Sequence, residues 1–328
     1  FNNNKHIEMI RCTLSAILLS LSLSLAAQYT YDFNENCRNA YAAIISLKFE
    51  EGEKIIQLEK TRNPKNNIPY LLDNYIYFLT VFINEEENTF ELFEDKKDAI
   101  IERLKDGDKE SPYYKYSLAQ VYLQWAVVRT KFKEYFTATI EINKAYRQLE
   151  KNEEEFPDFL PNNINLGLLH TMIGTIPDNY NWAKKIVGID GTIDQGVSEI
   201  LEVLNASFTQ EEFKHHKAEC VFYLSFIQMN LMSNKDKTFE YLEMIENDES
   251  SMQSPLAIYA LSRIYMGNGM NDKAIELLLN RPLGKEYFPF YYLDYITGLA
   301  KLRRLDEDAS KYFYKYVINF RGINYIKA

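Results

Sequence analysis

Cysteine, proline and glycine are all scarce in this chain. Its 328 residues include three Cys, nine Pro and 12 Gly. An all-β sandwich or barrel needs many turn residues to reverse its short strands, so this composition favours helices. Three cysteines are too few for a disulfide-stapled scaffold, so an apolar core must stabilise the fold. Charged residues (26%) and hydrophobic residues (46%) are near ordinary globular usage, which argues against a disordered chain and against a many-helix membrane protein.

Positive charge is also in short supply, because 37 Lys and Arg face 47 Asp and Glu, for a formal net charge of -10. That balance opposes long-range attraction to phosphate backbones, and no dense stripe of Lys and Arg overcomes it locally. Nucleic acid is therefore not an expected partner. The acidic runs at 85–87 and 153–155 fall where helices are expected to end, and we interpret them as solvated surface.

The N-terminal residues have the pattern of a secretory signal. Arg11 precedes an apolar stretch from Leu14 to Leu25, and the small residues Ala26 and Ala27 follow. We expect cleavage after Ala26 or Ala27, so that residues 1–27 hold the signal peptide with upstream residues and residues 28–328 form one helical repeat domain. The alternative is an uncleaved signal anchor, but the apolar stretch is short for a bilayer, so no stable membrane span is expected after cleavage.

The cysteines themselves leave two alternatives. Cys12 lies before the apolar stretch, whereas a bacterial lipoprotein needs its cysteine directly after it, so a lipid anchor is disfavoured. Cys37 and Cys220 remain after signal removal. They either form one long-range disulfide or are two independent buried thiols, and we prefer the thiols because buried Cys commonly behaves as a small apolar residue.

Apolar residues recur at three- and four-residue spacing along nearly the whole chain after residue 34, which predicts helix pairs joined by short turns. The clearest unit runs from Pro255 to Leu279, with Gly269 at its turn. Small residues at Ser262 and Ala274 allow its two helices to cross closely. Ala274 to Ala309 is a 35-residue step, and Thr238 to Ala274 is a 36-residue step. Successive steps near 34 residues are typical of a helical repeat.

This spacing resembles the tetratricopeptide repeat superfamily over most of residues 34 to 325. The resemblance implies an all-α, right-handed superhelix (an α-solenoid) of antiparallel helix pairs with a concave groove and a binding role. We count roughly six pairs. The pattern of a further helix begins just before the sequence stops at Ala328, so we expect the array to be truncated at its C-terminus.

One segment, 165–200, departs from the plain repeat. It contains Asn165-Leu166-Gly167, His170, Gly174 and the glycine-flanked turn from Val187 to Gly191. It is similar to a segment of the outer-membrane/inclusion-clearance family of tetratricopeptide-related proteins. We expect positive φ at Gly188 and Gly191, and close packing at Gly196 of a helix that begins near Thr192. From the signal pattern alone we expect the protein in the periplasm or at the outer membrane of a diderm bacterium.

Candidate chemistry is sparse. The turn at 187–191 lacks the ending of a P-loop and the dinucleotide-binding fingerprint. Glu212, His216 and Cys220 share one helix face, but the first and last are about 12 Å apart along the axis, too far to bind one metal ion without a distant further ligand. His170 lies among apolar residues and is predicted to be a packing histidine. We find no hydrolase or metalloprotease motif, and predict no catalytic residue, cofactor or metal site.

The leading interpretation is a non-enzymatic scaffold of the cell envelope that binds a partner peptide or helix. An alternative is a glycan- or small-ligand-binding envelope protein that uses its aromatic surplus, and a helical enzyme is a third hypothesis. The groove residues we predict from the first helices of the pairs are Tyr113, Tyr116, Gln120, Tyr259, Arg263, Tyr292 and Tyr295.

Overall fold

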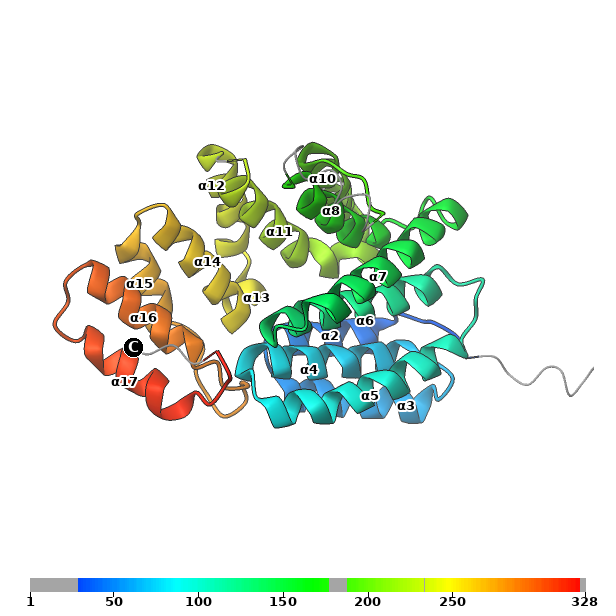
Figure 1. Cartoon of the computed structure of the whole chain (residues 1–328), viewed down its shortest axis with the longest axis horizontal. Coiled ribbons are helices and arrows are strands. Elements are labelled where there is room, and N and C mark those ends of the chain that lie inside the picture. Colours follow the sequence, from blue (N-terminus) through cyan, green and yellow to red (C-terminus); the bar gives the residue numbers. More distant parts are fainter. Residues whose placement is uncertain (1–28, 177–187, 233, 325–328) are drawn as a thin grey trace, which may run out of the picture.

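The structure, a computed structural model, describes residues 29–176, 188–232 and 234–324. In these ranges the chain consists of helices joined by turns and loops, with no β-strand (Figure 1). The predicted all-α fold is confirmed. Within the same ranges, none of the helices combines the length and the apolar character that crossing a membrane requires.

Consecutive helices pack against each other along the array. The first half of the described chain consists of α2 (Glu35–Ile45), α3 (Phe49–Arg62), α4 (Ile68–Asn84), α5 (Glu87–Lys105), α6 (Pro112–Lys131) and α7 (Tyr135–Glu155). The second half consists of α8 (Pro161–Gly174), α10 (Ile193–Thr209), the 3-10 helix η2 (Glu211–His216), α11 (Lys217–Asn230), α12 (Lys235–Glu246), α13 (Glu249–Met252), α14 (Pro255–Gly267), α15 (Asn271–Leu279), α16 (Tyr292–Arg303) and α17 (Ala309–Asn319).

Local sequence signals fix several of these boundaries. The side chains of Asn34 and Ser254 accept backbone N–H bonds at the starts of α2 and α14, where they satisfy donors that a helix leaves free. Pro255 follows as the first residue of α14, a position where its missing N–H costs nothing. The acidic runs lie at helix boundaries, as expected: α4 ends at Asn84 and α7 ends at Glu155.

The unit predicted from Pro255 to Leu279 forms the pair α14 and α15. Ser262 and Ala274 are fully buried between neighbouring helices, and Gly269 has a positive φ of 76° in the turn. The next pair repeats this close crossing, because a Cβ on Gly298 of α16 would lie 2.9 Å from the ring of Phe313 on α17. Small residues therefore set the approach of both pairs.

The atypical segment is confirmed in part. Thr192 caps α10, and a Cβ on Gly196 would lie 2.2 Å from the carbonyl oxygen of Gly167, so α8 and α10 touch backbone to backbone. Gly188 has the expected positive φ of 69°, but the expectation for Gly191 is wrong. Gly191 is small for another reason: a Cβ there would lie 2.6 Å from the Cα of His170. Residues 177–187 of this segment lie outside the described residues.

The two ends of the array contact each other. The loop between α15 and α16 brings the N–H of Phe288 to the carbonyl oxygen of Leu47, at 2.7 Å, and its ring stacks on Phe49 at 4.8 Å. Beyond α17, the N–H of Ile323 donates to the carbonyl oxygen of Glu85, at 2.9 Å. Figure 1 shows orange and red loop segments reaching the end of the cyan helices. The array therefore curls until its last loop and the residues after α17 meet its first helices.

Both described cysteines are free and buried, Cys37 in α2 and Cys220 in α11. Burial raises the pKa of the Cys37 thiol to about 12. The prediction of two independent buried thiols is confirmed, and each thiol packs within a core cluster.

Candidate functional site

The predicted groove residues fall into two groups that lie on different parts of the array. Tyr113, Tyr116 and Gln120 are on α6, in the first half. Tyr116 and Gln120 are 4% and 6% exposed, so in this structure they belong to the interior. Gln120 accepts a hydrogen bond from Asn165 at 2.7 Å. Tyr113 is half-buried and packs edge-on against Phe159, and burial raises its pKa to about 12.

The second group lies on α14 and α16, and here the structure brings the predicted residues together. The rings of Tyr259 and Tyr292 are 6.1 Å apart, and Tyr292 stacks on Tyr295 at 5.3 Å. All three rings are half-buried, and burial raises the pKa of Tyr259 and of Tyr292. Arg263 is exposed beside them and forms no ion pair with a described residue. This tyrosine cluster is a continuous aromatic surface, although most of its area is used in packing.

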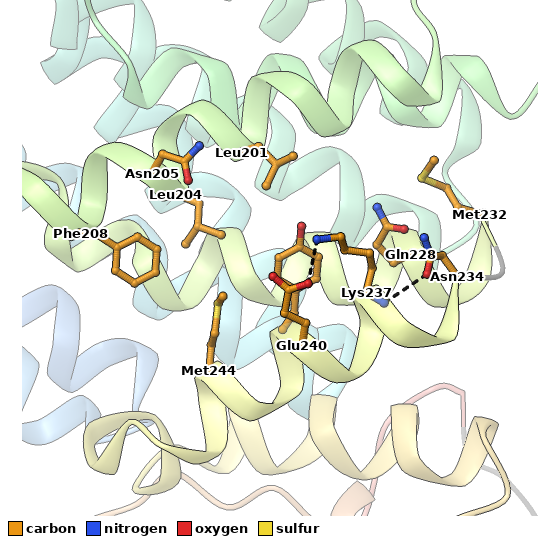
Figure 2. A pocket seen from close by; sticks show the side chains of 11 residues that line it. Leu201, Leu204, Asn205, Phe208, Gln228, Met232, Asn234, Lys237, Glu240 and Met244 are labelled. Carbon is orange, nitrogen blue, oxygen red and sulfur yellow. Dashed lines mark hydrogen bonds and ion pairs between the residues drawn. The ribbon is translucent and has the colours of Figure 1, made fainter.

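A separate hollow of about 400 Å³ lies between α10, α11 and α12 (Figure 2). Figure 2 shows Leu201, Leu204 and Phe208 pointing from α10 toward α12, with Met244 opposite them. The hollow is lined by Leu201, Leu204, Asn205, Phe208, Gln228, Met232, Asn234, Lys237, Glu240, Tyr241 and Met244. Its volume is within the range of sites that bind small molecules or single side chains of a partner.

Large apolar side chains at the rim of the hollow are left in solvent. Phe208 on α10 is 53% exposed, and Met232, just after α11, is 39% exposed. Lys217 lies over the ring of Phe208, with its Nζ 5.1 Å from the ring centroid. A few exposed apolar residues are normal on any surface, but two of them bordering a hollow with leucine walls mark a patch that another molecule could cover.

Polar groups line the other side. Lys237 donates to Glu240 at 2.7 Å, so these two charges pair with each other on the exposed face of α12. The side chain of Asn234 accepts the backbone N–H of Lys237 and so caps that helix. Tyr241 is 4% exposed, and burial raises its pKa.

Gln228 is the unusual member of the lining. Its side chain is 5% exposed, yet its Oε1 is buried without a hydrogen-bond partner among the described residues. Leaving a buried acceptor unpaired costs about 1–3 kcal/mol, so such a group usually has a water or a ligand as its partner. Gln228 lines the hollow, but its Oε1 has almost no accessible surface and is therefore a buried polar atom beside the hollow.

The hollow did not follow from the repeat pattern, which assigns residues to pairs and says nothing of a gap between pairs. One signal was available. Gln228 follows Leu224 at i+4 on the buried face of α11, where an apolar residue is expected. A carboxamide in an apolar stripe indicates an interruption of the apolar core, and Gln228 does line the hollow.

The other candidates from the sequence have ordinary surroundings. Among the described residues no group of three or more His, Cys, Asp and Glu is placed to hold a metal ion, so Glu212, His216 and Cys220 do not converge. His170 is 5% exposed, and its Nδ1 lies 2.8 Å from the carboxylate of Glu199. It is a packed histidine with a polar partner, as the sequence predicted.

Comparison of the chain with protein-family models, with curated proteins and with solved structures gives no match in any of the three. Function must therefore be inferred from the residues of the hollow and of the tyrosine cluster.

Proposed function

We propose that the chain is a binding scaffold that holds a segment of a partner protein in the hollow between α10, α11 and α12. The observation that carries the proposal is the hollow of about 400 Å³, with Leu201 and Leu204 in its wall and the exposed Phe208 and Met232 at its rim. An apolar side chain of the partner would fill the space between Leu201, Leu204 and Met244, and the rim would be covered. Binding sites commonly combine such an apolar centre with few polar contacts.

The test is capture of partners with variants of the rim. We expect Phe208→Ala combined with Met232→Ala to weaken binding of a co-purifying protein at least tenfold, because each truncation removes apolar contact area worth about 1 kcal/mol or more. Phe136→Ala is the matched control, since this ring on α7 is 81% exposed and does not line the hollow. A partner that is retained equally by the rim variant would contradict the proposal.

The same experiment distinguishes the hollow from the tyrosine cluster. Tyr259→Ala and Tyr292→Ala remove two rings of that cluster and leave the hollow intact. Loss of the partner with these variants, and not with the rim variant, would move the binding site to α14 and α16. The array would then bind through the first helices of its pairs, as a right-handed superhelix with a concave groove does; that handedness and the envelope location remain part of the proposal.

A small ligand is the second candidate, because a volume of about 400 Å³ suits one. A glycan or another small molecule that binds the folded chain raises its unfolding temperature, and the rise increases with the ligand concentration. A specific hit in a glycan array that also raises the unfolding temperature, and that the rim variant abolishes, would favour this function over a protein partner.

A further inference from the structure

The 3-10 helix η2 meets the first half of the array through the side chain of His215. The imidazole ring stacks on Phe33, with ring centroids 4.8 Å apart, and meets Tyr41 of α2 edge-on at 5.8 Å. Phe33 stacks in turn on Tyr113 of α6, at 6.0 Å. Two segments far apart in the sequence are therefore joined by a group of four rings, of which only the imidazole changes its charge near neutral pH.

The contact of η2 with α2 and α6 depends on side chains. η2 packs on α10 and α11, its neighbours in the chain. Among the described residues no backbone hydrogen bond joins η2 or α11 to α2 or α6. The hydroxyl of Tyr41 donates to the carboxylate of Glu219, on the first turn of α11, at 3.3 Å. This contact can therefore break while the helix pairs of the first half keep their own hydrogen bonds.

The docked position requires a neutral His215 ring. Burial, the ring of His216 at 4.0 Å and the nearby cation Arg38 oppose a charge there, and they outweigh the backbone of Glu212, which favours one. The charged or titratable groups at this contact are Asp32 before α2, Cys37, Arg38 and Tyr41 on α2, Tyr113 on α6, Glu212 and His216 on η2, and Glu219 and Cys220 on α11, while the last seven residues of α10 carry none.

Glu219 has other partners and does not offset a charge on His215. Its Oε2 lies 3.5 Å from Nδ1 of His216 and accepts from Tyr41, and its Oε1 accepts from Tyr223 at 3.3 Å. Both ring nitrogens of His215 are buried as well, so water cannot solvate a charged ring while η2 is docked.

Proton uptake by His215 therefore favours the undocked state. Docking lowers the pKa of His215 to about 2, whereas a ring in water keeps the ordinary value of 6.5. Below pH 6.5 the undocked ring binds a proton that the docked ring does not, so the ratio of undocked to docked chains rises about tenfold for each pH unit. A 3-10 helix of six residues has little stability of its own in water, so η2 unfolds once it is released.

We propose that the contact of η2 with α2 and α6 is a pH-controlled switch: η2 and the first turn of α11 are docked at neutral pH and are released in acid, while the helix pairs of the first half stay folded. Release uncovers Phe33, Tyr41 and Tyr113, which are buried or half-buried when η2 is docked. The acid form therefore presents an aromatic surface that the neutral form lacks, and this surface includes one of the groove residues predicted from the sequence.

The test is native-state amide hydrogen exchange of the full chain at pH 7 and pH 5, with each rate divided by the intrinsic rate at that pH. We expect the opening constant of residues 213–220 to rise about 25-fold from pH 7 to pH 5. Because this opening exposes little surface, low urea concentrations should hardly change it, whereas exchange in α4 should depend steeply on urea. Residues 213–220 that exchange with the urea dependence of α4 would overturn the proposal.

Three variants show whether His215 is the titrating group. His215→Phe keeps a ring in the stack and His215→Gln keeps a polar side chain, and neither takes up a proton. In both, the opening constant of residues 213–220 should differ less than twofold between pH 7 and pH 5. His170→Gln is the matched control, because this buried histidine lies on α8 beside Glu199, and it should leave the 25-fold rise unchanged. A rise that persists in either His215 variant, or that disappears in the control, would contradict the proposal.

Discussion

At the scale of single residues, Glu59 is a carboxylate that is 1% exposed and forms no ion pair with a described residue. Burial opposes its charge, but side-chain N–H groups of Asn36, Asn34, Asn63 and Asn66 outweigh that effect and lower its pKa to about 2. Asn34 also caps α2, and Asn66 bonds the backbone of Asp32. The Glu59 carboxylate therefore links Asn34, which caps α2, to Asn66, which bonds the backbone of Asp32.

We expect Glu59→Gln to lower the free energy of unfolding by about 1–3 kcal/mol, because an amide accepts fewer bonds and its N–H groups face other donors. The pKa of Glu59 is lower in the folded chain than its ordinary 4.5, so its contribution is complete above about pH 4.5 and is lost as pH falls toward 2. Urea titrations at pH 7 and pH 3 measure both effects. A wild-type chain that loses no more stability than the variant between these pH values would contradict this role.

His215 should make the fold sensitive to acid for a different reason. Its ring stacks on Phe33 at 4.8 Å, and both of its ring nitrogens are buried. Burial, with the nearby His216 and Arg38, lowers its pKa from 6.5 to about 2. The unfolded chain therefore binds a proton below about pH 6.5 that the folded chain does not, so stability falls as pH drops.

The free energy of unfolding is expected to fall by about 1.4 kcal/mol for each pH unit below 6.5, or by about 2 kcal/mol between pH 7 and pH 5. His215→Phe keeps a ring in the stack and removes the titrating group, so its stability should change less over this interval. Paired urea titrations of the two chains check this. Equal losses in both chains would show that another group carries the acid sensitivity.

At the scale of helices, the contact of α8 with α10 depends on Gly196. Gly→Ala in a helix interior ordinarily adds up to about 1 kcal/mol of stability through helix propensity. Here the added Cβ would lie 2.2 Å from both the carbonyl oxygen of Gly167 and the Oγ1 of Thr171. Backbone atoms cannot yield that space without separating the helices, so the clash outweighs the propensity.

We therefore expect Gly196→Ala to lower the melting temperature by several degrees, equivalent to at least about 2 kcal/mol. Ser198→Ala is the control, because Ser198 is exposed on the same helix and gains the propensity without the clash. Calorimetry of both variants gives the comparison. A Gly196→Ala chain as stable as the control would mean that α8 and α10 separate at little cost.

The helices themselves were largely predictable, because their signals are local. The apolar spacing predicted α14 and α15, and the small residues Ser262 and Ala274 identified their crossing from the sequence alone. Gly191 shows the limit of this reasoning: glycine in a turn suggested positive φ, while the cause is the backbone of His170, a contact across 21 positions that no local pattern contains.

At the scale of the whole molecule, the candidate site was less predictable than the fold. The predicted aromatic residues Tyr259, Tyr292 and Tyr295 do come together, because α14 and α16 contact each other. Tyr116 is in the interior, since tyrosine at helical spacing serves packing as readily as display. The hollow depends on how far α10 and α12 stand apart over α11, which is set by the whole array.

The closure of the array is likewise a long-range feature, and it can be tested at the loop between α15 and α16. Phe288 stacks on Phe49 and its N–H bonds Leu47, so this half-buried ring joins the last helix pairs to the first. Truncating it removes apolar contact worth about 1–2 kcal/mol while the helices on either side keep their own cores. The ends of the array should then separate more often than the helices unfold.

We expect Phe288→Ala to increase amide hydrogen exchange at Leu47 to Phe49 and at residues 284–290, with little change in α11 and α12. The radius of gyration from small-angle scattering should rise at the same time. Phe136→Ala, which removes an exposed ring that faces solvent, is the control and should change neither measurement. Uniformly faster exchange in Phe288→Ala would mean that the contact stabilises the entire chain as one cooperative unit, and that the two ends do not open independently.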